Sequence, residues 1–141
     1  MLEYIEVKRL SPNAILPTRA HHDDAGMDLY ALDDEHIMPQ QKQIVATGIA
    51  IAVPTGFFGL IGDRSSMAKR GAKVAGGVVD AGYRGEIKIV IWNLSNEVIQ
   101  LKKGERIAQM MIIPIVTPAI QEVDILDETQ RGLGGFGSSG R

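Results

Sequence analysis

The fold of this chain is decided by residues 76–92, which read GGVVDAGYRGEIKIVIW. Two apolar runs, Val78-Val79 and Glu86–Trp92, flank a loop that contains two glycines. Glycine tolerates a positive φ, so the pattern predicts a β-hairpin with a loop of about five residues. The loop carries an acid, a ring and a cation: Asp80, Tyr83 and Arg84. In most hairpins such residues only cap a turn, pack down or stay solvated. A functional role therefore needs support from other stretches.

Outward from this stretch, the hydrophobic pattern remains that of strands. Short β-branched or alternating segments recur, separated by Gly, Pro, Asn or Asp. The best helix signal is a turn or two at Ser65–Arg70, which Ser65 or Ser66 would cap. Many short strands with few helices favour an all-β, jelly-roll-like antiparallel sandwich or barrel and disfavour a parallel βαβ layout. The remaining strands are expected at Glu3–Leu10, Met27–Ala31, Gln43–Val53, Phe57–Ile61, Val98–Lys102, Arg106–Val116 and Ala119–Leu126.

Length and composition narrow the class of protein. A chain of 141 residues is expected to form one β domain, residues 1–126, followed by a flexible tail, residues 127–141. The net charge of −2 produces no electrostatic field that would attract nucleic acid or an anionic membrane without a local cluster of basic residues. There is no cysteine, so disulfides and thiolate metal sites are excluded. Without a signal peptide pattern or a stretch of ~18 apolar residues, a soluble cytoplasmic protein is expected.

Two of the predicted strands carry apolar residues on both faces. They are the segment from Ile44 to Val53 and the segment from Ile107 to Ile115. A strand of a monomeric sandwich usually turns one polar face to water. Part of this surface is therefore expected to be covered by another subunit, although a deep single-chain core explains the composition equally well.

The carboxyl-terminal tail combines flexibility with one aromatic ring. Phe136 lies among five glycines between Gly132 and Gly140, bracketed by Arg131 and Arg141. So little apolar area cannot offset the entropy of ordering the segment, and the tail is expected to be mobile. A plain linker does not need this ring, so we favour a tail that folds over a ligand.

Two further stretches carry polar groups suited to an anion. Arg64, Ser65 and Ser66 precede or begin the short helical turn, an arrangement typical of a phosphate site. Gln109 is a lone amide in an apolar strand, either bonded in the core or offered to a ligand. Residues 21–24, HHDD, contain side chains that can bind a metal ion. Adjacent side chains of an extended segment point to opposite faces, however, so these four cannot coordinate one ion together.

Five segments, in order, resemble the motifs of the trimeric dUTP diphosphatases (dUTPases): AGMDLYA, GDRSSMA, GGVVDAGYRGEI, GERIAQMMI and RGLGGFGSSG. The resemblance implies a jelly-roll subunit and a homotrimer with active sites at subunit interfaces. It also implies hydrolysis of dUTP to dUMP and diphosphate, with Mg²⁺ held mainly by the triphosphate of the substrate. Such an enzyme limits uracil in DNA and supplies dUMP for dTMP synthesis.

Position by position, the resemblance gives individual residues roles. Asp80 would activate the water that attacks the α-phosphate, and Tyr83 would leave no room for a ribose 2′-hydroxyl. Asp28 would lie in the outer shell of the metal, through water, and Phe136 would stack on uracil when the tail closes. The backbone at Gly77, Val78 and Val79 would pair with uracil, and Lys88 would also contact the substrate. The residues implied at the phosphates are Arg64, Ser65, Ser66, Gln109, Arg131, Gly137, Ser138 and Ser139.

The chemistry required agrees with these roles. Hydrolysis at phosphorus needs an oriented water, neutralised phosphate oxygens and a dry pocket, which Asp80, the Arg64 cluster with Mg²⁺, and Phe136 would supply. Four departures from the usual pattern occur. Ser66 and Ser139 replace a common glycine and threonine with a mild effect expected, and residues 22–24 differ from the usual small hydroxyl residues and receive no role. The other two bear on the site. Gly82 stands where many relatives carry a second acid, and Asp63 stands where proline is more usual, with a charge expected to weaken the Arg64 cation.

Two other functions are compatible with the residues. The homologous dCTP deaminases, and bifunctional relatives that make dUMP from dCTP, resemble this chain in the predicted hairpin, but they are longer and lack a tail such as GGFGSSG. A nucleotide-binding jelly roll without turnover is the second alternative, and the retention of Asp80 argues against it.

Overall fold

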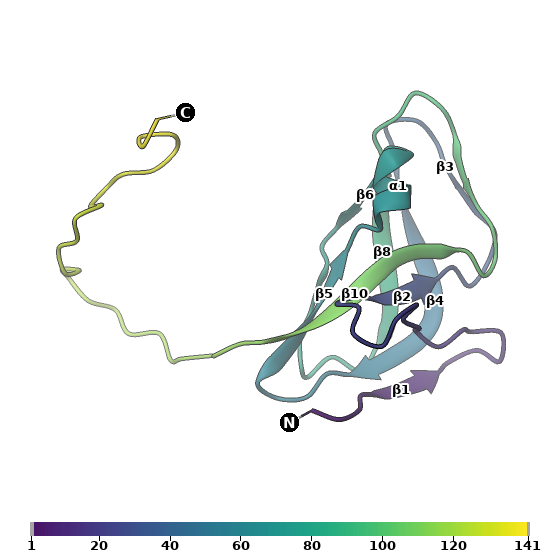
Figure 1. Ribbon diagram of the computed structural model, residues 1–141, viewed down its shortest axis with the longest axis horizontal. Helices are drawn as coiled ribbons and strands as arrows, with labels where there is room; N and C mark the ends of the chain where they lie inside the picture. The colour runs from purple at the N-terminus through teal and green to yellow at the C-terminus, as the bar shows by residue number, and fades with distance from the viewer. Residues whose placement is uncertain (1, 141) are drawn as a thin grey trace.

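The computed structural model describes residues 2–140 and is built almost entirely from strands (Figure 1). Within these residues the helical segment is α1 (Ser65–Lys69), and no helix is long and apolar enough to cross a membrane. The strands are β1 (Glu6–Arg9), β2 (Met27–Tyr30), β3 (Glu35–Ile37), β4 (Lys42–Ala52), β5 (Phe57–Gly62), β6 (Ala72–Ala75), β7 (Val78–Val79), β8 (Glu86–Asn93), β9 (Ile99–Leu101) and β10 (Arg106–Pro114).

Two four-stranded antiparallel sheets form the body. Their strand orders are β1-β4-β8-β6 and β2-β10-β5-β7, and β3 and β9 form a separate two-stranded ribbon. Alternation along β8 directs Ile87, Ile89 and Ile91 inward, each no more than 2% exposed. They share one hydrophobic core with Leu29 of β2 and Met110 of β10. Burying each such side chain contributes about 1.5–3 kcal/mol. The all-β, jelly-roll-like prediction is confirmed.

The predicted hairpin is wrong in one respect, because β7 and β8 do not pair with each other. β7 pairs with β5, with Val79 opposite Gly59 and Val78 opposite Leu60. β8 pairs instead with β4 and β6 in the other sheet. The loop at residues 80–85 therefore carries the chain from one sheet to the other. Alternation shows which residues are strands but not which strand lies alongside, so the sequence pattern could not separate the two arrangements.

Three local predictions also need correction. Ala119–Leu126 forms no strand, and the short strands β3 and β6 were not anticipated. β3 reads Glu-His-Ile and is too short and polar to show a period. In α1, the N-cap position belongs to Arg64 and no side chain caps the helix, so neither Ser65 nor Ser66 has the predicted capping role. The burial of Met67 holds this short turn against the core.

The strands that read as apolar on both faces divide into two cases. The second half of β4 is buried within the single chain, with Ile49 and Ile51 at most 1% exposed. The deep-core explanation therefore accounts for this half. Ile44 in the first half is 57% exposed, and the end of β10 is only half-buried at Ile112 and Ile113. These positions remain free for a covering surface.

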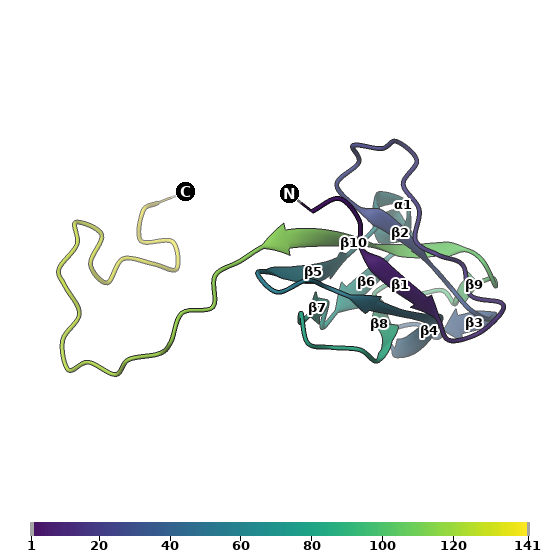
Figure 2. The same cartoon turned by 90° about the horizontal axis from the view of Figure 1, so that it is seen from below.

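Beyond β10 the chain leaves the body as an extended arm (Figures 1 and 2). Its last backbone bond to the body joins the Ile115 N–H to the Gly56 carbonyl at 2.9 Å. The arm then exposes large apolar side chains: Val116 is 88%, Ile120 100% and Ile125 85% exposed. Apolar area of this kind is unfavourable in water, so the arm is a candidate surface for contact with another molecule.

Candidate functional site

The loop between β7 and β8 forms one wall of a pocket of about 230 Å³. The pocket collects five of the predicted site residues, four from β7 and the loop and one, Lys88, from β8. Asp80 is exposed at its rim, and Tyr83 is 46% exposed rather than packed into the core. The lining residues are Ile61, Gly76, Val78, Val79, Asp80, Tyr83, Glu86, Ile87 and Lys88.

Hydrogen bonds within the loop fix its shape. The Tyr83 N–H donates to the Asp80 carbonyl at 3.1 Å, and the Tyr83 hydroxyl donates to the Glu86 carbonyl at 2.7 Å. Arg84 donates through Nη1 to the Ala81 carbonyl at 2.6 Å. A Cβ on Gly85 would lie 2.5 Å from the Tyr83 hydroxyl oxygen, so glycine lets the ring lie flat over the loop. The backbone of Tyr83 is thus held to Asp80, and its hydroxyl to Glu86.

β7 is packed closely on β5 and forms the edge of its sheet. The Gly77 carbonyl accepts from the Ile61 N–H at 2.7 Å, and a Cβ on Gly77 would lie 2.3 Å from the Ile61 carbonyl oxygen. Val79 points into the core, whereas Val78 is 63% exposed. An edge strand presents backbone N–H and C=O groups that pair with whatever lies alongside. The outer edge of β7 can therefore hydrogen-bond a planar polar ligand in the pocket.

A second group of predicted residues meets at the other end of the same sheet. Asp28 of β2 lies opposite Gln109 of β10, and Gln109 lies opposite Gly62 of β5. Arg64 follows β5, and its Nε lies 3.0 Å from Oδ1 of Asp28. Arg106 approaches Oδ2 of Asp28 at 3.9 Å. Two guanidinium groups around one carboxylate leave donors for an anion such as a phosphate group.

The hydroxyls and the amide complete this basic corner, which we define as Asp28, Arg64, Ser66, Arg106 and Gln109. Nη1 of Arg64 donates to Oγ of Ser66 at 3.3 Å and to the Arg106 carbonyl at 3.3 Å. Nε2 of Gln109 donates to the Asp63 carbonyl at 2.8 Å. Gln109 is thus neither a satisfied core amide nor a free one: one of its two N–H groups is used and the side chain remains half-buried.

The charge of Asp63 does not fall on Arg64, contrary to expectation. Its Oδ2 lies 2.6 Å from Nζ of Lys73, and its Oδ1 accepts from the Val74 N–H at 2.7 Å. Both partners belong to β6, in the opposite sheet. The carboxylate is therefore paired with the charge of a lysine and hydrogen-bonded by a backbone amide.

The structure does not bring all predicted residues together in one chain. The pocket lining contains none of Arg64, Ser65, Ser66 and Gln109. The tail residues lie farther away: Phe136 is fully exposed, and the tail hangs clear of the body in Figure 1. Its internal contacts are turns, such as the 2.8 Å bond from Nε of Arg131 to the Gly134 carbonyl. One chain thus provides a pocket, a basic corner and a tail that are mutually separated. The remaining predicted tail residues, Gly137, Ser138 and Ser139, are exposed with it.

Residues 21–24 form a turn instead of a metal site. The His21 N–H donates to Oδ2 of Asp24 at 2.9 Å, and Nε of Arg19 donates to the Asp24 carbonyl at 2.9 Å. Among residues 2–140 no group of three or more His, Cys, Asp or Glu side chains is placed to hold a metal ion. Any metal bound by the described residues would therefore need ligands from elsewhere, such as substrate oxygens.

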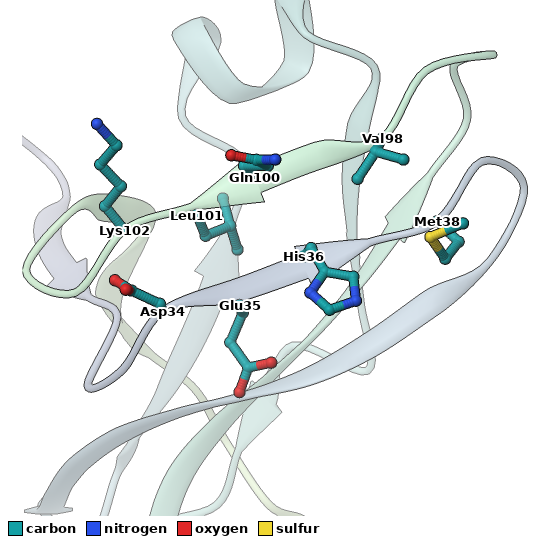
Figure 3. Close-up of a pocket in the computed structure, with 8 residues that line it drawn as sticks. All are labelled: Asp34, Glu35, His36, Met38, Val98, Gln100, Leu101 and Lys102. Atoms are coloured by element: carbon teal, nitrogen blue, oxygen red, sulfur yellow. The ribbon is translucent and has the colours of Figure 1, made fainter.

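A larger cavity, of about 550 Å³, lies beside the β3 and β9 ribbon and holds none of the predicted residues. Its side chains do not converge: Glu35 and Lys102 point away from each other in Figure 3. Oε2 of Glu35 accepts from Nε2 of Gln43 at 3.1 Å, and Oδ1 of Asp34 accepts from the Lys103 N–H at 2.7 Å. These polar groups serve the fold, so the pocket beside β7 is the better candidate.

Sequence reasoning missed two charged residues of the site. Glu86 lines the pocket next to Lys88, and period-two alternation along β8 would have found it, because residues two apart share a face. Arg106 joins Arg64 around Asp28, and its position in GERIAQMMI was the available signal.

Comparison with known proteins places this geometry in a family. The dUTPase family model matches residues 12–140. The deoxyuridine 5'-triphosphate nucleotidohydrolase of Rhodococcus erythropolis is 48% identical over 140 residues, covering 96% of this chain and 85% of that protein. The dUTPase of Staphylococcus bacteriophage 80alpha, solved with dUpNHpp, has a TM-score of 0.92 and 34% identity, covering 98% of this chain and 99% of that chain.

A dUTPase variant from phage phi11 of S. aureus, described with a structural Mg(II) ion, has a TM-score of 0.84 and 27% identity over 89% of this chain and all of that chain. The family match spans nearly the whole of the described chain and includes the pocket, the basic corner and most of the tail. This chain belongs to the dUTPase family.

Proposed function

We propose that this chain hydrolyses dUTP to dUMP and diphosphate, with a water activated by Asp80 attacking the α-phosphorus. The observation that carries the proposal is the pocket beside β7, where an exposed carboxylate lies at the rim of a rigid loop with an anchored tyrosine. A carboxylate held in this way can orient a water and take its proton.

The edge of β7 would recognise the base. Backbone groups around Gly77, Val78 and Val79 offer a fixed set of donors and acceptors, and uracil and cytosine present opposite patterns at the atoms that differ. A mismatched base leaves buried polar groups unpaired, which discriminates strongly. The Tyr83 ring would lie against the deoxyribose, with its hydroxyl bonded to Glu86, so that a 2′-hydroxyl meets a side chain that cannot rotate away.

The basic corner would bind the phosphates through Arg64, Ser66 and Gln109, together with the neighbouring Ser65. Mg²⁺ would neutralise phosphate charge when bound. The described residues contain no cluster of three ligands, which agrees with a metal held mainly by the oxygens of the substrate. Both oxygens of Asp28 face guanidinium groups, at 3.0 and 3.9 Å, which favours a water-mediated contact over direct ligation.

The site would be completed between copies of the chain, in a homotrimer. Three features support this: the pocket lacks the basic corner, the tail leaves its own body, and the arm exposes Ile120 and Ile125. In the assembly, Phe136 would cover the base, while Arg131, Gly137, Ser138 and Ser139 approach the β- and γ-phosphates. A cytoplasmic location stays a prediction from the sequence.

The test is diphosphate release from dUTP with Mg²⁺, compared with dCTP, dTTP and UTP under the same conditions. Turnover of dUTP alone is expected. Deamination of dCTP would instead favour the deaminase alternative, and binding of dUTP without turnover would favour a non-catalytic nucleotide-binding protein. The dUTPase names of the relatives favour hydrolysis over both. Sedimentation at micromolar concentration tests the trimer, which a stable monomer would contradict.

A further inference from the structure

Asp63 connects the two sheets at the end of β5, immediately before Arg64 of the basic corner. Its side chain bonds the Val74 N–H at 2.7 Å and Nζ of Lys73 at 2.6 Å, both in β6. β6 is the edge strand of its sheet, so alternate N–H groups face away from β8 and need another acceptor. The Asp63 carboxylate provides that acceptor for Val74.

The backbone of Asp63 reaches in the other direction. Its carbonyl oxygen accepts from Nε2 of Gln109 at 2.8 Å, and the next residue, Arg64, pairs with Asp28. A shift of Asp63 would therefore move the Gln109 amide and the start of the Arg64 side chain together. The side chain of Asp63 is only 22% exposed, so the tether to β6 lies partly shielded from water.

Lys73 balances the charge that this tether introduces. An unpaired carboxylate one residue from Arg64 would repel a triphosphate, and the ion pair with Lys73 removes most of that repulsion. A neutral residue at position 63 would need no partner lysine. Asp63 and Lys73 thus form one unit that fixes the corner without opposing its ligand.

We propose that Asp63 is a positioning residue for phosphate binding, acting through Gln109 and Arg64, and that Lys73 neutralises it. The proposal rests on the proposed function of the basic corner. Loss of the Asp63 side chain would weaken binding of the triphosphate equally in the ground state and in the transition state. KM would therefore rise, and kcat would stay nearly unchanged.

The experiment compares Asp63→Ala, Asp63→Asn, Lys73→Met and the double variant Asp63→Asn/Lys73→Met in steady-state dUTP hydrolysis at two salt concentrations. Asp63→Ala loses the tether, and KM is expected to rise about tenfold. Asp63→Asn keeps an acceptor for Val74 and should remain within about threefold of the parent. Lys73→Met leaves a bare carboxylate, so KM should rise about threefold at low salt and less at high salt.

The double variant has neither charge, and its KM is expected to return to within about twofold of the parent. Lys8→Met is the matched control, because Lys8 is an exposed lysine on β1, the opposite edge strand of the same sheet. It should leave KM and its salt dependence unchanged. A second readout, amide exchange at Val74, should accelerate in Asp63→Ala and not in Asp63→Asn.

An unchanged KM in both Asp63→Ala and Lys73→Met, or a fall in kcat alone, would overturn the proposal. Should Asp63→Ala fail to fold, Lys73→Met and its rescue by Asp63→Asn still decide it. Titration of the same variants with Mg²⁺ and dUpNHpp separates the two levels of inference. If the parent binds this analogue but does not turn over dUTP, the proposed function fails, while the order of variant affinities still tests Asp63.

Discussion

The contact between Gly77 and β5 gives the sharpest prediction, for Gly77→Ala. A Cβ at this position would lie 2.3 Å from the carbonyl oxygen of Ile61 and 3.2 Å from its carbonyl carbon. These are backbone atoms, so no side-chain rotation can relieve the clash, and β7 must move. The movement also weakens the 2.7 Å bond from the Ile61 N–H to the Gly77 carbonyl. The substitution therefore displaces the segment proposed to bind the base.

The magnitude follows from these two contacts. Overpacking costs about 1–3 kcal/mol, and a weakened backbone hydrogen bond costs about 0.5–1.5 kcal/mol. The total is about 1.5–4.5 kcal/mol when the two contributions are added. β7 has only two ladder pairs, so it can yield locally without unfolding the sheet. If the whole cost falls on substrate binding, kcat/KM for dUTP decreases about 10- to 2,000-fold.

Gly82→Ala is the matched control, in the loop that follows β7. A Cβ on Gly82 meets no atom within 4 Å, and Gly82 is absent from the residues with positive φ. Its kcat/KM for dUTP should stay within about threefold of the parent, as for most exposed substitutions. The assay is diphosphate release at subsaturating dUTP, with a thermal melt of each variant. Equal kcat/KM values for Gly77→Ala and Gly82→Ala, with equal melting midpoints, would refute the reasoning.

Three further outcomes are expected. Asp80→Asn keeps the shape of the rim but removes the proton acceptor, so kcat should fall by about two to four orders of magnitude while dUpNHpp still binds, as measured by calorimetry; an active variant would contradict the assigned role. Deleting residues 132–141 removes the exposed tail, so turnover should fall while the melting midpoint hardly changes, since Phe136 contacts no part of its own body. Asn93→Ala removes a fully buried amide that donates to the Ile37 and Glu97 carbonyls and accepts from the N–H and hydroxyl of Ser95. The free energy of unfolding, measured with denaturant, should therefore fall by about 3–5 kcal/mol. A decrease below about 1 kcal/mol would show that water replaces these bonds.

Strands with a long alternating or apolar pattern could be predicted from the sequence, whereas the partners of the shortest strands could not. β8 alternates along its eight residues and β10 is an almost continuous apolar run of nine, and both were anticipated close to their observed bounds. β6 is four residues long, and β7 only two, which is too short for a period to reveal the partner strand. The prediction at Ala119–Leu126 failed because apolar residues there have no neighbouring strand in their own chain.

The sequence by itself identified the family, because Asp80, Tyr83, Arg64 and Gln109 occur in short segments that resemble its motifs, and it predicted that these residues carry the chemistry. Only the tertiary structure decided that the loop crosses between sheets, that Asp63 pairs with Lys73, and that the pocket, the basic corner and the tail of one chain lie apart. The physical reason is the separation along the chain of the residues that interact. Periodicity and motifs are properties of neighbouring residues, whereas strand partners, ion pairs and the surfaces left for another copy depend on how distant segments pack.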